Sequence, residues 1–161
     1  ASWSCPEMAP VVSHPPLDPV IAAELDRMIA AEPPSYMAYL LGFTGENSLT
    51  QQVARAREDR FTAILDGDAV AGFFCLRGFD AGYARPSFGI YVASHHQGRG
   101  LAKASMAEAI SQARRAGADS ILIKCHADNV SALKVYTDAG AVFTGLCPDT
   151  GQNTYDLPIR P

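Results

Sequence analysis

The pattern of hydrophobic and polar positions divides the chain near residue 60. In the first part, apolar residues recur at helical spacing after Asp18, a good N-cap with Pro19 at the first helical position, until Pro33-Pro34 ends the run. The other elements predicted for this part are a short strand over Pro10–Ser13, helices over Ser35–Leu41 and Asn47–Arg57, and a break at Gly42–Gly45.

Beyond residue 60, strands and helices alternate. Two apolar runs flank Asp66-Gly67-Asp68, which is a strong hairpin signal, and an amphipathic helix follows residue 100 and ends near Gly117. The predicted strands are Phe61–Leu65, Ala69–Leu76, Ser87–Val92, Ile121–Cys125, Ala141–Leu146 and Asn153–Ile159, and a last helix runs from a cap at Asp128 or Asn129 to Gly140. This order predicts an α/β (α+β) fold with a mixed, mostly antiparallel central sheet and helices on both faces.

Length and charge narrow the class of protein. The 161 residues suit one domain, 1–161, in which residues 1–7 are either an added or a disordered segment and Met8 is a candidate start. The net charge of −4 argues against generic nucleic-acid binding, and no run has the length of a membrane span or the pattern of a signal peptide. We therefore expect a cytoplasmic protein without nucleic-acid or membrane partners.

The cysteines and histidines do not form a metal-binding pattern. The cysteines are Cys5, Cys75, Cys125 and Cys147, without a paired spacing, and reduced, mostly buried thiols are the simplest interpretation. His95 and His96 are adjacent, and in extended chain their side chains would point in different directions. No metal site is predicted.

The turn between the strand at Ser87–Val92 and the following helix carries the clearest chemistry. Gly98 and Gly100 lie where the chain enters the helix, so the backbone can approach a ligand without a Cβ in the way. Unpaired N–H groups and the helix dipole at such a point make a site for a pyrophosphate-sized anion. The alternative is a glycine-rich loop that enters an ordinary helix.

Two motifs in this order resemble the GCN5-related N-acetyltransferases (GNAT). Gln97, Gly100 and Ala102 match the family's Gln/Arg-x-x-Gly-x-Gly/Ala signature. Downstream, Asn129 to Phe143 resembles its Asn-x-x-Ala-x-x-x-Tyr-x-x-x-Gly-Phe segment, although Ala141 stands where the family usually has Phe. The resemblance covers roughly residues 61–143 and implies an acetyl-CoA-dependent N-acetyltransferase.

The resemblance also implies where acetyl-CoA would bind. The N–H groups of the glycine turn would bind the pyrophosphate, the end of the fourth strand would bind the amide arm, and Arg99 and Lys103 would either add charge or form a solvated helix start. The implied cofactor-binding residues are Tyr91, Val92, Ala93, Gln97, Gly98, Arg99, Gly100, Leu101, Ala102 and Asn129. Asn129 is equally suited to cap the next helix.

Tyr136 is the implied catalytic residue, because a tyrosine at this place in the family donates a proton to the CoA thiolate. Phenol and thiol acidities are close enough for that transfer. Without the resemblance, a core aromatic on an amphipathic helix is the better interpretation. No carboxylate lies in Ser87–Val92, so candidates for the base are Asp80, Tyr83, Tyr91, His126 or a water.

The loop Arg77–Ser87 places polar and aromatic residues beside the expected thioester. It weakly resembles loops of acetyltransferases that act on nucleotide-linked amino sugars, with Asp80 and Tyr83 as substrate-binding candidates, and it equally suits an ordered hairpin turn. The expected acceptor is a primary amine of a small molecule, over which the aromatic residues Tyr36, Tyr39 and Phe43 would close. Alternatives are a protein N-terminus or lysine, or a CoA-binding module without catalysis; a homodimer is plausible for the family.

Overall fold

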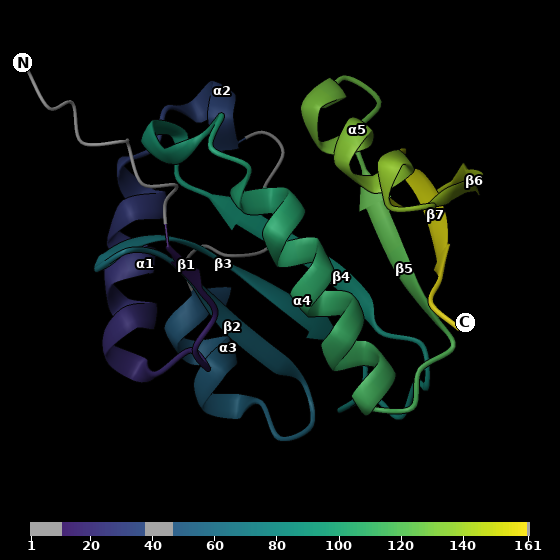
Figure 1. The fold of residues 1–161 in the computed structure, drawn as a ribbon, viewed down its shortest axis with the longest axis horizontal. Coiled ribbons are helices and arrows are strands. Elements are labelled where there is room, and N and C mark those ends of the chain that lie inside the picture. Colours follow the sequence, from purple (N-terminus) through teal and green to yellow (C-terminus); the bar gives the residue numbers. More distant parts are fainter. Residues whose placement is uncertain (1–10, 38–46, 161) are drawn as a thin grey trace, which may run out of the picture.

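A seven-stranded sheet runs through the computed structural model, which describes residues 11–37 and 47–160 (Figure 1). The strands lie in the order β1-β2-β3-β4-β5-β7-β6, and every neighbouring pair is antiparallel except β4 and β5. The strands are β1 (Val12–Ser13), β2 (Arg60–Asp66), β3 (Ala69–Arg77), β4 (Ser87–Val92), β5 (Ser120–Cys125), β6 (Val142–Leu146) and β7 (Asn153–Pro158). The predicted mixed, mostly antiparallel sheet is confirmed.

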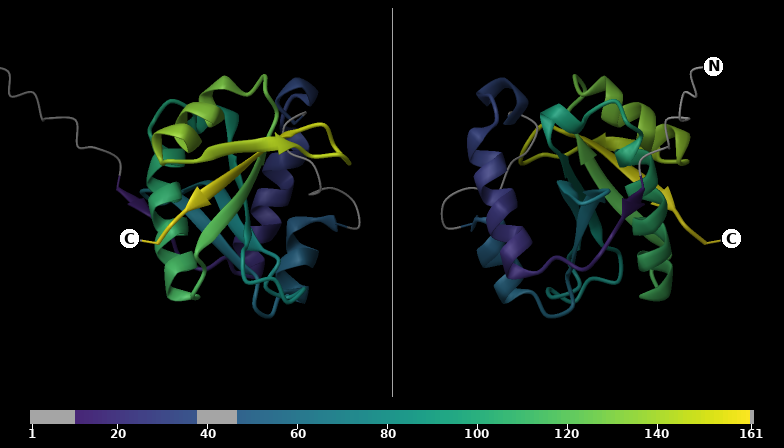
Figure 2. Two further views of the ribbon diagram at one scale, coloured as in Figure 1. Left: turned by 90° about the vertical axis from the view of Figure 1, so that its right-hand side faces the viewer. Right: turned by 60° about the vertical axis from the view of Figure 1, so that its left-hand side comes forward.

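Helices cover both faces of this sheet, as predicted. In Figures 1 and 2, α4 crosses one face, while α1 and α3 lie against the other. The helices are α1 (Pro19–Ala31), α2 (Pro34–Met37), α3 (Leu49–Arg55), the short 3-10 helix η2 (Ser94–His96), α4 (Leu101–Arg115) and α5 (Val130–Asp138). Among the residues that the structure describes, no helix is both long and apolar enough to cross a membrane.

The alternation of the strands explains the two cores. On β3, Phe74 and Leu76 belong to the cluster under α4 and α5, whereas Phe73 and Cys75 belong to the cluster under α1 and α3. β4 divides in the same way, so that Tyr91 faces α1. The central strands are therefore apolar on both faces, which matches their nearly continuous hydrophobic runs.

One carboxylate attaches α3 to α1. Asp26 on α1 accepts hydrogen bonds from the backbone N–H groups of Leu49 and Thr50, at 2.9 and 3.0 Å, and from the Thr50 hydroxyl at 2.6 Å. Two of the N–H groups that have no partner within α3 are thereby satisfied. Ser48 caps the same helix through the Gln51 N–H.

The parallel pair β4–β5 is short, and this feature creates the site. Only Ser87 with Leu122 and Phe88 with Ile123 are paired, after which the strands separate (Figure 1). The rest of β4 remains paired with β3, and the rest of β5 with β7. A gap therefore opens inside the sheet toward the end where α2 and α5 lie.

Some predictions fall wholly or partly outside the described residues. The strand at Pro10–Ser13 is described from Val11 on, and the helix at Ser35–Leu41 up to Met37. The break at Gly42–Gly45, the residues Tyr39 and Phe43, Cys5 and the segment 1–7 are not described. The three cysteines that are described, Cys75, Cys125 and Cys147, are buried and unbridged, as expected.

The expectation for the adjacent histidines was wrong. His95 and His96 lie in η2 and not in extended chain, and their ring centroids are 4.4 Å apart. A tight helical turn follows Ala93 because the chain must reverse between β4 and α4 within a few residues. Among the described residues, no three potential metal ligands cluster.

Candidate active site

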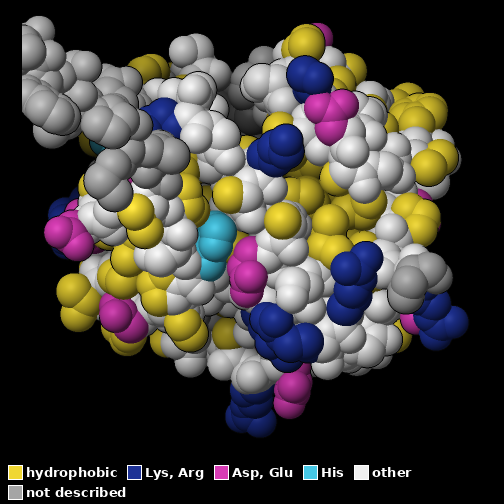
Figure 3. Space-filling view, in the orientation of Figure 1, with side chains coloured by type: hydrophobic (Ala, Val, Ile, Leu, Met, Phe, Trp, Pro, Cys, Tyr) yellow, Lys and Arg dark blue, Asp and Glu magenta, His cyan; other side chains and the backbone are white. Residues whose placement is uncertain are grey.

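A cleft of about 860 Å³ occupies the separation between β4 and β5. Its walls include β4 along its whole length, the glycine turn, the first turn of α4, the end of β5 and one side of α5. In Figure 3, hydrophobic side chains gather beside α4 on this face, with Lys and Arg side chains around them. The motifs that were singled out separately in the sequence thus meet in one cavity.

The glycine turn at the mouth of the cleft is shaped for an anion. Gly98 and Gly100 have φ values of 80° and 76°, which side chains other than glycine rarely allow. A Cβ at either position would meet no atom within 4 Å, so open space lies beside the backbone. Gly100 caps the 15-residue helix α4 without a side-chain hydrogen bond, which leaves the first N–H groups of α4 available to a ligand.

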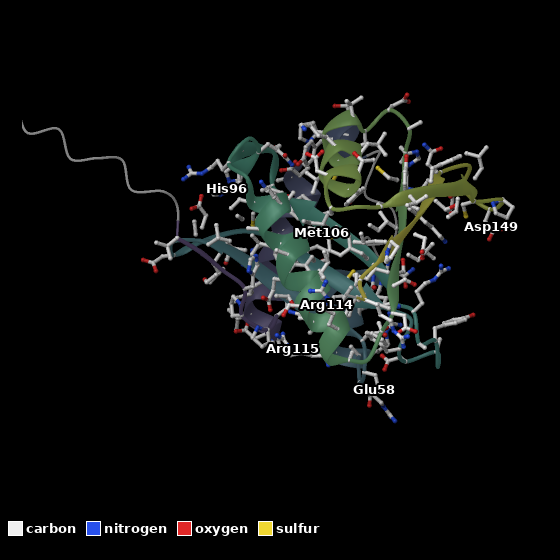
Figure 4. All side chains as sticks on the ribbon, turned by 45° about the vertical axis from the view of Figure 1, so that its right-hand side comes forward. Glu58, His96, Met106, Arg114, Arg115 and Asp149 are labelled. Carbon is white, nitrogen blue, oxygen red and sulfur yellow. The ribbon has the colours of Figure 1, made fainter. Side chains whose placement is uncertain are left out.

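The two basic residues beside this turn behave differently. Arg99 does not line the cleft; its Nε lies 3.0 Å from a carboxylate oxygen of Asp66, which is mostly buried on β2. His96, labelled at the start of α4 in Figure 4, lies 3.7 Å from the same carboxylate. Lys103 lines the cleft and is exposed. Of the two predicted cations, Lys103 is the one that lines the cleft.

Gln97 closes the end of β4. Its side-chain amide donates to the Val92 carbonyl at 3.3 Å and to the Tyr36 hydroxyl, which itself donates to the same carbonyl. Burial raises the pKa of Tyr36. The hydrogen bond from Gln97 opposes this rise, and the Glu32 carboxylate adds to it. Tyr36, from α2, is therefore a wall of the cleft that sequence reasoning had mentioned only as part of a closing segment.

The strand residues predicted to bind the cofactor arm divide into two groups. Tyr91 and Val92 line the cleft, whereas Ala93 does not. The Ala93 N–H donates to the Ala71 carbonyl at 2.8 Å and is therefore already used within the sheet. The Ala93 N–H is therefore directed at β3 and is not available in the cleft.

Tyr136 lies in the cleft wall and in the core at once. Its ring packs edge-on against Phe88, with centroids 6.1 Å apart, and the side chain is almost entirely buried. Burial raises the pKa of Tyr136, and the neighbouring Cys125 raises it further, so the phenol keeps its proton at neutral pH. The two interpretations of this residue, core aromatic and proton donor, are compatible.

Asn129 caps its helix, as predicted, and also lies at the cleft. Its Oδ1 accepts a hydrogen bond from the Ala132 N–H at 3.4 Å and so caps α5, the helix that carries Tyr136. Asn129 lines the cleft as well. Asn129, the first residue of the segment that resembles the family motif, thus caps the helix that positions Tyr136.

The loop between β3 and β4 does not contribute to this cleft. Asp80 accepts hydrogen bonds from the backbone N–H groups of Arg57 and Glu58, which lower its pKa, and it lines a separate hollow of about 160 Å³. Tyr83 is 68% exposed and lines neither. Asp80 holds the loop before β2 in place, and nothing in the geometry brings either residue to the cleft.

A carboxylate that the sequence did not single out lies behind β4. Glu32, at the end of α1, accepts hydrogen bonds from the Ser94 N–H at 3.3 Å and the Ser94 hydroxyl at 3.0 Å. Its other oxygen and the Tyr91 hydroxyl are buried, and neither meets hydrogen-bond geometry with a described group. Burial raises the pKa of Tyr91, and Glu32 raises it further. The hydrogen bonds join the end of α1 to η2 across 62 residues, so no local pattern could have revealed them.

The remaining base candidate, His126, follows β5 and lines the cleft. Tyr91 and His126 are thus the two candidates that the structure places in the cavity, and Asp80 and Tyr83 lie outside it. The arrangement provides an anion site at one end, an open strand edge along the middle and a protonated phenol in the opposite wall. These are the parts that transfer of an activated acyl group requires.

Comparisons with solved structures find proteins of the same fold. A putative acetyltransferase from Salmonella typhimurium, yncA, solved with acetyl-CoA, has 17% identity and a TM-score of 0.70, covering 92% of this chain and 94% of that chain. The spermidine N-acetyltransferase from Vibrio cholerae, in complex with CoA and spermine, has 16% identity and a TM-score of 0.74, covering 90% and 92%. RimL, a ribosomal L7/L12 alpha-N-protein acetyltransferase, has 15% identity and a TM-score of 0.76, covering 91% and 90%.

No relative among curated proteins matches the chain significantly. The comparison with protein families matches residues 21–141 to the acetyltransferase (GNAT) family, which is most of the chain and includes both motifs. The match confirms the predicted family and, with it, an acetyltransferase that uses acetyl-CoA as acyl donor. The glycine turn, the separated strands and the matched residues together lead to one conclusion: this chain belongs to the acetyltransferase (GNAT) family.

Proposed function

We propose that the protein transfers an acetyl group from acetyl-CoA to a primary amine of a small molecule, with both substrates bound together. One observation carries the proposal: the glycine turn and Tyr136 line the same cleft, at the point where β4 and β5 separate. An anion site and a protonated phenol in one cavity supply the two ends of an acyl-CoA reaction.

The residues of the cleft fit acetyl-CoA, which supplies a thioester-activated acetyl group when bound. The N–H groups between Gly98 and Ala102 would bind its pyrophosphate, with Lys103 adding positive charge. The free edge of β4 up to Val92 would bind the amide arm through backbone groups, one of which donates to the oxygen where negative charge develops. Asn129 lies within the same wall.

Tyr136 would act as the acid. Its hydroxyl is protonated at neutral pH, because burial disfavours the phenolate, and it lies in the wall that faces β4. A proton held at this oxygen is available to the thiolate that leaves when the amide bond forms. His126 is the candidate that would accept the proton of the amine, since the raised pKa of Tyr91 keeps that phenol protonated.

The decisive experiment is Tyr136→Phe. CoA release and the mass of the acetylated product are measured with a panel of amino sugars, nucleotide-linked amino sugars, amino acids, polyamines and N-terminal peptides. We expect kcat to fall at least about 100-fold, the usual contribution of a general acid, while acetyl-CoA still binds with unchanged affinity. Tyr83→Phe, outside the cleft, is the matched control and should behave as the unmodified protein.

Three other outcomes would contradict the proposal. If the unmodified protein binds acetyl-CoA and acetylates none of these amines, a binding module without catalysis is the better description. If Tyr136→Phe turns over at the original rate, the phenol serves packing only. Acetylation of the peptides alone would assign the acceptor to proteins.

A further inference from the structure

The charge of the cleft is opposite to that of the whole protein. The chain carries a net charge of −4, yet the described residues that line the cleft include Arg77, Lys103 and Lys124 and neither aspartate nor glutamate. A cavity lined by one sign of charge concentrates ligands of the other sign. Lys103 lies at the glycine turn, where the pyrophosphate accounts for it, so Arg77 and Lys124 need a different explanation.

Arg77 and Lys124 lie on the face of the sheet that is turned away from α4. Arg77 pairs with Ser87, which pairs with Leu122, so these three residues form one row across the sheet. Lys124 is two residues beyond Leu122 on β5 and therefore shares their face. The residues on either side of Lys124, Ile123 and Cys125, belong to the core under α4 and α5. The two cations thus project from the side opposite the helix whose N-terminus forms the anion site.

Nearby carboxylates are already engaged. Asp156, in the same row as Leu122, forms an ion pair with Arg85 at 3.1 Å. Glu32 lies behind Tyr91 with one oxygen on Ser94, and it does not line the cleft. Among the residues that the structure describes, no carboxylate lies within 4.0 Å of the Lys124 ammonium group. The Arg77 guanidinium donates to the Gln52 amide oxygen at 3.1 Å, and Arg77 also lines the smaller hollow together with Asp59 and Asp80.

We propose that the acceptor amine carries an acidic group, a carboxylate or a phosphate, which Lys124 binds. The inference rests on the proposed acetyltransferase function and names its substrate class. Positive charge beside the amine also lowers the pKa of an ammonium group and so increases the fraction of neutral, nucleophilic amine. A polycation would meet only repulsion from these side chains.

The test uses pairs of amines of which only one member carries an acidic group: leucine and leucinamide, 2-aminoethylphosphonate and ethanolamine, and a nucleotide-linked amino sugar and the free amino sugar. Turnover is measured as CoA release with product mass. In each pair that reacts, kcat/KM should be at least about tenfold higher for the anionic member. The pair with the larger ratio distinguishes a carboxylate acceptor from a phosphate acceptor.

Lys124→Met tests the residue, because methionine keeps much of the side-chain length and removes the charge. We expect KM for the anionic amine to rise about tenfold, with kcat nearly unchanged and the preference within each pair lost. Lys134→Met is the control, because Lys134 is exposed on α5, pairs with Asp138 and lies outside the cleft. Titration of the CoA-saturated protein with the preferred amine measures acceptor binding without turnover, and Lys124→Met should weaken it to the same extent.

The outcomes separate this inference from the function on which it rests. Higher kcat/KM for the neutral amines, or for a polyamine, would overturn the anionic acceptor and leave the acetyltransferase intact. Weaker acetyl-CoA binding by Lys124→Met with an unchanged preference would assign Lys124 to the cofactor instead. If no amine reacts although acetyl-CoA binds, the proposed function fails and the acceptor class fails with it.

Discussion

Gly72 on β3 and Gly89 on β4 differ in the space around them, and replacing each with alanine tests this difference. A Cβ on Gly72 of β3 would lie 1.9 Å from the Tyr91 carbonyl oxygen, so the backbones of β3 and β4 must move apart to admit it. A Cβ on Gly89 of β4 would meet only the Cys75 sulfur, at 3.2 Å, and a side chain can shift by a few tenths of an ångström. Gly72→Ala should therefore lower the free energy of unfolding by about 1–3 kcal/mol or more, and Gly89→Ala by clearly less.

Urea denaturation of both variants measures this difference. Neither glycine has a positive φ, so the comparison concerns space and not backbone conformation. Equal midpoints for the two variants would contradict the close approach at Tyr91. Gly72 lies beside the end of β4. If Gly72→Ala loses acetyl-CoA binding and Gly89→Ala retains it, the added methyl group has moved β3 and β4 apart.

At this scale the sequence predicts backbone features better than side-chain partners. The turn at Gly98 and Gly100 was recognisable because glycine spacing is a local property, and both residues adopt the positive φ that it implies. Arg99 and Asp80 were predicted to face ligands, but Asp66 and the backbone before β2 bind them instead. Those partners come from other segments of the chain, so spacing alone could not identify them.

At the scale of elements, one histidine connects the β1 segment to α4. His14 Nε2 lies 3.1 Å from the Ser105 hydroxyl, and its ring packs edge-on against Phe74 with centroids 5.7 Å apart. Burial lowers the pKa of His14, an effect that Glu108 partly opposes. The neutral ring is therefore favoured in the folded state.

The sign of the pH effect follows from that shift. A histidine whose folded-state pKa is below its unfolded value stabilises the fold fully above the unfolded value of 6.5, and this contribution is lost as pH falls from there through the folded pKa. When the pH is lowered from 7.5 to 5.5, the thermal midpoint of the unmodified protein should fall more than that of His14→Gln. His95→Gln, an exposed control, should fall as the unmodified protein does. Parallel losses in His14→Gln and the unmodified protein would show that His14 does not couple to folding.

Most element boundaries were predicted to within a residue or two, because periodicity, caps and Gly or Pro breaks are local signals. The hairpin around Gly67 and the helix from Leu101 are examples. The separation of β4 from β5 was expected only from the family resemblance, since pairing across 35 residues leaves no mark on either strand alone. The turn η2 was missed because Ser94–His96 has no helical period of its own.

At the scale of the whole molecule, the two cations beside the glycine turn should affect different properties. Lys103 lines the cleft, so Lys103→Ala should weaken acetyl-CoA binding roughly tenfold, or by about 1.4 kcal/mol, at low salt. Arg99 instead neutralises Asp66, which is 9% exposed, so Arg99→Ala should lower the thermal midpoint and change acetyl-CoA affinity less.

Calorimetric titration and thermal unfolding of the two variants check this division. Added salt should reduce the difference in acetyl-CoA affinity between Lys103→Ala and the unmodified protein, because salt screens the attraction between Lys103 and the phosphates. A larger loss of affinity in Arg99→Ala than in Lys103→Ala would contradict the side-chain directions seen in the structure.

The short pairing of β4 with β5 has a consequence for how such a chain can diverge. It exposes backbone N–H and C=O groups along β4 inside the molecule, and these groups are present whatever side chain occupies each position. A ligand held by such groups places few demands on residue identity. Chains can then differ at more than four positions in five, as this one does from the solved structures at 15–17% identity, and still share one fold.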